Sequence, residues 1–151
     1  MTGPNSPQEP RPFSGRFAGY AAIFGRPDAG GDVIRAGAFA ESLAAHEATG
    51  LPLPLLWQHR PEQAIGWIEH VAEDARGLRV IARLANPEGA NAAMLAAGEV
   101  TGLSFGYRAR EAREIALPGA GTGRELSAID VFEISLVANP MQDAARVHLV
   151  V

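Results

Sequence analysis

The sequence contains no cysteine, and this absence removes several kinds of chemistry at once. A thiol nucleophile, a thiolate metal site and a disulfide bond are all excluded, so covalent catalysis has to use another nucleophile such as serine. A chain without cysteine also fits a reducing compartment.

Long apolar runs are missing as well. No stretch approaches the roughly 20 apolar residues that a membrane-spanning helix needs, so we expect no membrane partner. The first residues, MTGPNSPQEPRPFSG, lack the basic and then apolar layout of a secretion signal. We therefore expect the chain to stay in the cytoplasm.

Positive charge is scarce. The formal net charge is -4, from 13 basic and 17 acidic residues, and the basic residues form no block. A protein that binds nucleic acid needs a basic face to neutralise phosphates. The sequence therefore predicts no nucleic-acid partner.

The composition that remains is that of a globular protein with a proline-rich start. A chain of 151 residues with 47% hydrophobic residues suits one domain with a core. Pro4, Pro7 and Pro10 lie among polar neighbours, which cannot bury enough apolar surface to become ordered. We predict a flexible tail over residues 1–13 and a single domain over residues 14–151.

Short apolar runs predict strands in the first half of this domain. One strand is expected over residues 16–24 and another over residues 51–59, where alternate positions place Trp57 and His59 on one side and Pro61 ends the strand. The runs AIGWIEHVA and GLRVIARLA, separated by the polar EDARG, predict a β-hairpin.

Two short helices are expected between the strands. Apolar residues recur at helical spacing over residues 35–48. A second helix should begin with Asn86 as its N-cap and Pro87 at its first position, and Gly98 should end it. Alternating or extended runs in the remainder, around TGLSFGYRAR, RELSAIDVFEISLV and ARVHLVV, bring the total to about six or seven strands. The expected fold is a mainly β barrel or sandwich.

The stretch TGLSFGY contains the first candidate for chemistry. Gly102, Ser104 and Gly106 satisfy G-x-S-x-G, the pattern of the nucleophile elbow in α/β-hydrolases. Ser104 lies on the face of its predicted strand opposite the apolar side chains, and the two glycines allow another backbone to approach closely. It is either a nucleophile or a strand residue that faces solvent.

A serine nucleophile needs a base, and four histidines are available. His46 and His70 each adjoin a glutamate and suit solvated surface positions, while His148 in the last strand suits a structural role. His59 ends an apolar strand where a loop begins, a place from which catalytic groups are often presented. His59 is therefore the candidate base.

The segment DVFEISLV supplies two candidate acids, Asp130 and Glu133. Strict alternation would place Asp130 beside Ile134 and Glu133 beside Val131, so that each carboxylate lies among apolar neighbours. A buried carboxylate needs a partner. That partner is either a histidine or an arginine.

Two arrangements of a serine hydrolase compete. The order Ser104, Asp130, His148 imitates the α/β-hydrolases, but that fold needs a helix directly after the serine and a large parallel sheet, and FGYRARE continues as a strand. The order His59, Ser104, then Glu133 or Asp130 needs a different scaffold.

Seven blocks of the sequence, in this order, resemble the prohead (capsid maturation) proteases of HK97-type tailed phages and of gene transfer agents. The blocks are GYAAIFG, DVIRAGAF, LLWQH, IGW, GLRVIARL, GLSFGY and EISLVANP. The resemblance implies a serine endopeptidase with the assemblin-like β-barrel fold of the herpesvirus proteases. It also implies action inside the immature capsid, in the host cytoplasm, on the major capsid protein or a scaffold protein, and often on the protease itself.

Carried onto this chain, the resemblance makes His59 the base, Ser104 the nucleophile and Glu133 the third member, with Asp130 next in line. Herpesvirus relatives use a second histidine as third member, but no histidine lies between Ser104 and His148. The mechanism implied requires no metal or cofactor, and the resemblance allows a homodimer. The alternative function is a non-catalytic β-barrel component of a virion.

Overall fold

The computed structural model describes residues 12–151, and the fold is mainly β. The strands are β1 (Arg16–Ile23), β2 (Asp32–Ile34), β3 (Pro54–Trp57), β4 (Arg60–Glu73), β5 (Gly77–Leu84), β6 (Gly102–Leu117), β7 (Gly121–Val137) and β8 (Val147–Val150). The helices are α1 (Ala40–Thr49) and α2 (Ala90–Ala96). Neither helix is long and apolar enough to cross a membrane. The predicted tail lies almost wholly outside the described residues, and Phe13 packs against the core.

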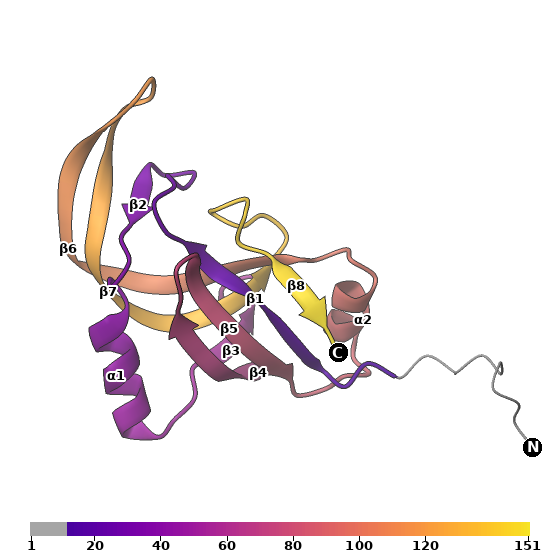
Figure 1. Cartoon of the computed structure of the whole chain (residues 1–151). Coiled ribbons are helices and arrows are strands. Elements are labelled where there is room, and N and C mark those ends of the chain that lie inside the picture. Colours follow the sequence, from indigo (N-terminus) through magenta and orange to yellow (C-terminus); the bar gives the residue numbers. More distant parts are fainter. Residues whose placement is uncertain (1–11) are drawn as a thin grey trace, which may run out of the picture.

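The strands form one sheet in the order β2-β7-β3-β4-β5-β1-β8, and β6 pairs with β7 (Figure 1). β2 and β3 run parallel to β7, and the other pairings are antiparallel. The expected mainly β fold is confirmed, but the sheet is not a closed barrel.

At the open seam of the sheet, a few backbone contacts replace a ladder of strands. An isolated bridge pairs Gly102, at the start of β6, with Arg146, just before β8. Around it, the Leu103 N–H donates to the Ala145 carbonyl at 2.9 Å and the Val147 N–H donates to the Thr101 carbonyl at 2.9 Å. The seam is therefore joined at one end only.

The core fills the inner face of this curved sheet. Apolar side chains at alternate positions of the strands are buried, and α1 and α2 add a few more. The largest fully buried side chains are Phe17, Ile34, Phe39, Leu55, Leu78, Leu103, Leu126, Ile129, Ile134 and Leu136.

The chain reverses between β3 and β4 earlier than the sequence predicted. Trp57 pairs with Arg60, so Gln58 and His59 alone make the turn, and Pro61 lies inside β4 instead of ending a strand. Gln58 and His59 have φ of 52° and 59°. Positive φ at both central residues is what a two-residue type I′ hairpin turn requires, and it is strained for residues other than glycine or asparagine. His59 thus stands at a hairpin tip, not on a face of β3.

The second helix begins later than predicted. Its N-cap is Gly89, and no side chain caps it. Asn86 instead accepts the Glu88 N–H on its side-chain oxygen at 3.1 Å, which makes a turn ahead of the helix. The predicted end is confirmed, because Gly98 follows the helix with φ of 73°.

A β-bulge in β7 changes which side chains share a face. Gly106 pairs with Glu133 and Tyr107 pairs with Val131, so Phe132 is an extra residue that has no partner on β6. Phe132 is 53% exposed, and the alternation reverses across it. The faces predicted for the two acids are therefore wrong. Val131 and Ile134 are both buried, so Glu133 lies opposite to Val131 and Asp130 lies opposite to Ile134.

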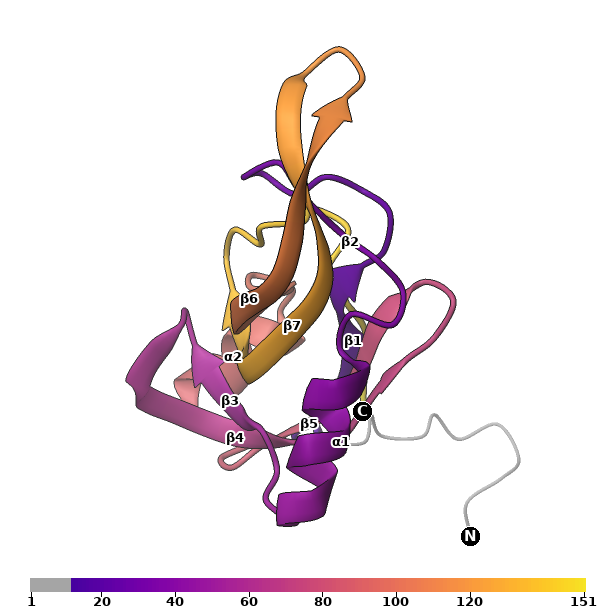
Figure 2. The same cartoon turned by 90° about the vertical axis from the view of Figure 1, so that its left-hand side faces the viewer.

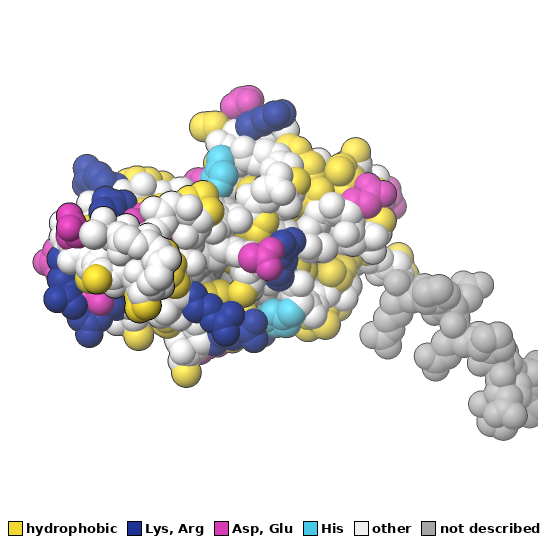
Figure 3. All heavy atoms as spheres, turned by 90° about the horizontal axis from the view of Figure 1, so that it is seen from above, with side chains coloured by type: hydrophobic (Ala, Val, Ile, Leu, Met, Phe, Trp, Pro, Cys, Tyr) yellow, Lys and Arg dark blue, Asp and Glu magenta, His cyan; other side chains and the backbone are white. Residues whose placement is uncertain are grey.

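The far ends of β6 and β7 form a long arm that projects beyond the sheet (Figure 2). Residues 118–120 form the short turn between the two strands. Charged side chains pair along the arm, as when Arg113 donates to Glu125 at 2.8 Å. Seen from the arm's end of the molecule, acidic and basic side chains lie intermingled (Figure 3).

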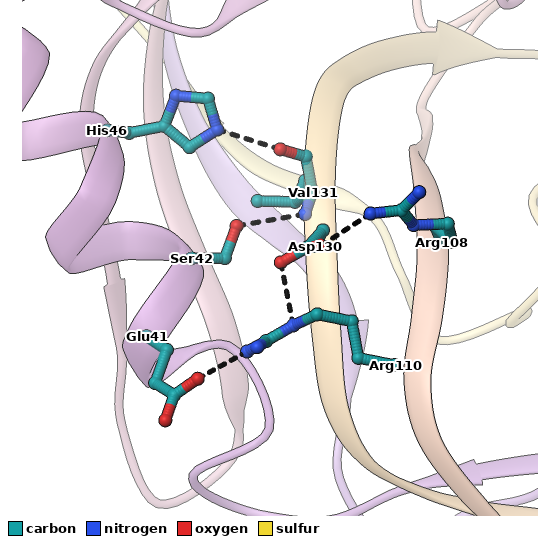
Figure 4. A network of polar contacts seen from close by, with 7 residues as sticks. All are labelled: Glu41, Ser42, His46, Arg108, Arg110, Asp130 and Val131. Carbon is teal, nitrogen blue, oxygen red and sulfur yellow. Dashed lines mark hydrogen bonds and ion pairs between the residues drawn. The ribbon is translucent and has the colours of Figure 1, made fainter.

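Helix α1 covers a stretch of β7 that no strand pairs on that side. β2 pairs with residues 124–126 of β7, and β3 pairs with residues 134–136. Between them, the Val131 N–H donates to the Ser42 hydroxyl at 3.0 Å and the Val131 carbonyl accepts from His46 Nε2 at 2.8 Å (Figure 4). His46, expected to be solvated, is therefore half-buried and bonded.

Candidate active site

Ser104 lies on β6 directly opposite Ser135 of β7. Opposite residues of an antiparallel pair place their side chains on the same face about 5 Å apart. Ser104 is 6% exposed, so it does not face open solvent as the plainer interpretation of the sequence supposed. Among the described residues its hydroxyl makes no hydrogen bond.

The two glycines that flank Ser104 make room for parts of β7 and the turn after it. A Cβ on Gly102 would lie 2.6 Å from the Val137 carbonyl oxygen and 2.8 Å from Cδ of Pro140. A Cβ on Gly106 would collide with the carboxylate of Glu133. The G-x-S-x-G match therefore reflects strand packing on both sides of the serine and not a nucleophile elbow.

His59 is brought to β7 by the β3–β4 hairpin. Parallel pairing of Trp57 with Leu136 places the hairpin tip beside the end of β7, and the turn at Gln58 and His59 brings His59 back toward Glu133. His59 Nδ1 lies 2.6 Å from Glu133 Oε1, and the His59 backbone N–H donates to the Ser135 hydroxyl at 3.2 Å. The imidazole is thus fixed at Nδ1, which leaves Nε2 free to act on a substrate or nucleophile.

The bulge at Phe132 explains why Glu133 reaches His59. It reverses the alternation of β7, so that Glu133 and Ser135 lie together on the face away from the core, opposite Gly106 and Ser104. The Ser135 hydroxyl donates to Glu133 Oε2 at 2.6 Å. The Glu133 side chain is only 13% exposed, so both carboxylate oxygens are held by protein groups.

The contact with Glu133 changes the acid–base properties of His59. Its hydrogen bond and its negative charge raise the pKa of His59, while partial burial of the ring lowers it. The net direction is upward from the ordinary value of 6.5. A carboxylate that stabilises an imidazolium in this way is suited to the third position of a serine–histidine–acid arrangement.

Asp130, the other candidate acid, is used elsewhere. It forms ion pairs with Arg110 Nε at 2.9 Å and with Arg108 at 3.5 Å, beside α1 (Figure 4). This is the arginine partner that the sequence left open for an acid of this segment. Asp130 therefore makes a structural contact with β6 and none with His59 among the described residues.

The other histidines lie away from Ser104. His46 binds β7 from α1, His70 is on the exposed side of β4, and His148 packs against Tyr20 with ring centres 5.8 Å apart. The chain also contains no lysine, so a serine–lysine pair is not available.

Among the residues that the structure describes, His59 and Ser104 make no hydrogen bond with each other. Catalytic hydrogen bonds in free enzymes are often long and shorten when substrate binds. Ser135, which sequence reasoning missed, lies between them. Its position two residues after Glu133, and so on the same face, was the signal that could have found it.

Serine, imidazole and carboxylate on neighbouring strands define a site of the serine-hydrolase class. The sequence model of the family described as caudovirus prohead serine protease matches residues 7–151, and the chain belongs to that family.

A curated relative and two solved structures are similar to the chain. The prohead protease of Enterobacteria phage HK97 is 31% identical over 138 residues, which cover 88% of this chain and 59% of that protein. The varicella-zoster virus protease shares 13% identity with a TM-score of 0.53, over 88% of this chain and 62% of the other. The KSHV protease bound to a hexapeptide phosphonate inhibitor shares 16% identity with a TM-score of 0.48, over 87% and 63%. The likeness to the varicella-zoster enzyme confirms the expected assemblin-like fold.

Proposed function

We propose that this chain is a serine endopeptidase that cuts a capsid or scaffold protein during maturation of a phage-like prohead. The observation that carries the proposal is the contact of His59 Nδ1 with Glu133 on the same face as Ser104. Membership in the prohead serine protease family supports it. The chain spans 59% of the length of its HK97 relative, so the activity and partners of the whole protein belong to this proposal.

In the proposed mechanism, Ser104 Oγ attacks the carbonyl carbon of the scissile peptide while His59 Nε2 accepts the hydroxyl proton. Glu133 holds the Nδ1 proton and stabilises the imidazolium. The tetrahedral intermediate then expels the amine, which takes the proton from Nε2, and leaves an acyl group on Ser104. Water activated by His59 hydrolyses this ester and restores the serine.

The turn after β7 is the proposed source of the oxyanion donor. Val137 pairs with Gly102 in the ladder, the Ala138 N–H donates to Gln58 Oε1 at 3.1 Å, and Pro140 has no N–H. The N–H of Asn139 is left to face a developing oxyanion. This turn packs over Gly102 and so lies beside the strand of Ser104.

The proposed partners are proteins of the prohead, and the proposed place of action is the interior of the immature capsid in the host cytoplasm. Self-cleavage and a homodimer belong to the same proposal. The substrate form proposed is an extended peptide that lies beside a strand edge.

The test is co-expression with the capsid or scaffold protein encoded beside it. Ser104→Ala and His59→Ala should each abolish processing, while Ser127→Ala, a change at an exposed serine of β7, should leave it intact. A fluorophosphonate probe should label the unmodified protein and not the Ser104→Ala variant. Processing at the normal rate with Ser104→Ala would show that Ser104 is not the nucleophile. Absence of processing and of labelling with the unmodified protein would favour the alternative, a non-catalytic component of the virion.

A further inference from the structure

We propose that Ser135 is a positioning residue that holds the base and the acid of this site in register. The inference rests on the proposed function, because it assigns a role beside Ser104, His59 and Glu133. Its basis is a pair of contacts made by one hydroxyl: Ser135 donates to Glu133 Oε2 at 2.6 Å and accepts the His59 backbone N–H at 3.2 Å.

These contacts close a ring of hydrogen bonds that begins and ends on His59. The backbone N–H of His59 donates to Ser135, Ser135 donates to one oxygen of Glu133, and the other oxygen receives the Nδ1 proton of His59. A hydroxyl has one proton, and here it is committed to the carboxylate. The direction of each bond in the ring is thereby set, and members of such a ring strengthen one another.

This ring of hydrogen bonds controls both the position and the rotation of the His59 imidazole. His59 occupies a strained turn with φ of 59°, and its bond to Ser135 opposes relaxation of that backbone. The hydrogen bond from Ser135 to Glu133 fixes the carboxylate, which in turn fixes the imidazole of His59 through Nδ1. A carboxylate held by His59 alone could rotate about its side-chain bonds and carry the imidazole with it.

Ser135 itself is not suited to be the nucleophile. Its residue is fully buried, with 0% exposure, and its proton faces a carboxylate. Ser104, on the opposite strand, has neither constraint and keeps 6% exposure. Of the two neighbouring serines, Ser104 is therefore suited to be the nucleophile and Ser135 to position His59 and Glu133.

The variant that tests this role is Ser135→Ala, and the matched control is Ser42→Ala. Ser42 is another buried serine, 5% exposed, whose hydroxyl also accepts a backbone N–H of the same sheet but lies beside α1. Both variants lose one buried hydroxyl. Comparison of their melting temperatures therefore shows how much of any effect of Ser135→Ala is a general loss of stability and not a displacement of His59.

The direct readout is the proton NMR spectrum of the His59 ring. A short Nδ1–H bond to a carboxylate gives a proton signal far downfield of ordinary imidazoles, and we expect it in the unmodified chain and in Ser42→Ala. In Ser135→Ala the signal should broaden or move upfield. With a cleavable peptide, kcat should fall on the order of 10- to 100-fold with KM little changed, since a base misplaced by about 1 Å has this effect. An unchanged signal in folded Ser135→Ala overturns the proposal.

A second measurement needs no variant, so it applies even if Ser135→Ala fails to fold. The His59 amide lies at an exposed turn, and its hydrogen exchange should be slow because Ser135 accepts it. Exchange as fast as in an open loop overturns the proposal. Both NMR measurements are independent of cleavage: a chain that shows the ring but cleaves nothing refutes the proposed function and leaves the placement by Ser135 standing.

Discussion

At the scale of single residues, His59 is constrained from two directions. Its side chain meets Glu133, and its backbone is held in a left-handed conformation at the tip of the β3–β4 hairpin. Neither constraint comes from a neighbour in sequence, since Glu133 is 74 residues away. A residue with so little local support depends on the sheet around it for its reactivity.

The raised pKa of His59 leads to a prediction about pH. A general base has to be neutral, so kcat/KM should rise with pH through the pKa of His59, above the ordinary 6.5. Glu133→Gln removes the negative charge, and this acidic limb should then move to lower pH, with a lower plateau in kcat. A pH–rate profile and an NMR titration of His59 measure both effects.

The control for this prediction is Glu69→Gln, which removes a carboxylate of β4 that pairs with Arg83 and not with His59. If the acidic limb of the pH–rate profile lay at the same pH in Glu133→Gln and in the unmodified chain, the role proposed for Glu133 would be contradicted. The sign for stability is opposite to that for activity. Because the folded pKa is raised, the stabilisation from this pair is complete below 6.5 and is lost as pH rises through the folded pKa.

At the scale of elements, the close approach of β6 and β7 depends on glycine opposite the acid. Gly106 has no Cβ to displace the Glu133 carboxylate. Gly106→Ala should push that carboxylate off His59 and lower kcat on the order of 10- to 100-fold, while the melting temperature changes little. Peptide cleavage and thermal unfolding measure the two effects.

Gly30→Ala is the matched control for this change. A Cβ on Gly30 would meet its nearest neighbours at 3.4 and 3.5 Å, which is ordinary contact, so activity should be retained. Normal cleavage by Gly106→Ala would show that the carboxylate tolerates displacement, against the geometry described above.

The elements themselves were largely predictable, because apolar alternation and turn residues are local signals. Strand β1, the β4–β5 hairpin and the end of α2 at Gly98 lie where the sequence placed them. The bulge at Phe132 was not predictable, since one inserted residue in a strand leaves no local mark and reverses every later side chain. The turn at Gln58 and His59 also lacks the glycine or asparagine by which such turns are recognised.

The candidate site was predictable in its members but not in its contacts. His59, Ser104 and Glu133 follow from motif blocks. The choice of Glu133 over Asp130 depends on which of them lies beside the docked β3–β4 hairpin, because Glu133 meets His59 and Asp130 meets Arg110. Alternation places Ser135 on the same face as Glu133, but its contact with His59 is visible only when the pairing of β3 with β7 is known. Pairing between distant segments is the information that periodicity does not contain.

At the scale of the whole molecule, one ion pair joins the base of the arm to the rest of the sheet. Arg124 of β7 donates to both oxygens of Asp32 of β2, each at 2.9 Å, and the Tyr107 hydroxyl donates to the same carboxylate at 3.1 Å. These bonds, Arg124 foremost, lower the pKa of Asp32 against the effect of burial. Burial, with the bond to Asp32, raises the pKa of Tyr107 to about 12.

This ion pair predicts the response of the fold to acid. A lowered folded pKa gives stabilisation that is present above the ordinary value of 3.8 and is lost as pH falls through the folded pKa. Arg124→Gln should cost about 1–3 kcal/mol at neutral pH and move the acid-unfolding midpoint to higher pH. Arg113→Gln, at an exposed pair with Glu125, should cost much less stability, because solvent screens an exposed ion pair. Urea unfolding from pH 3 to 7 measures the free energy of unfolding of both variants. Equal losses of stability in the two would contradict the prediction.

The parallel pairing of β3 with β7 has a consequence for the order of events during folding. The nucleophile and the acid lie on one antiparallel hairpin, β6–β7, whose strands are close in the chain, but the base arrives only when a distant hairpin docks alongside. Closing so long a loop is among the slower steps of β-protein folding. If the proposed roles hold, a newly made chain carries its serine and its carboxylate before it carries its base, and we expect it to be inactive until the sheet is complete.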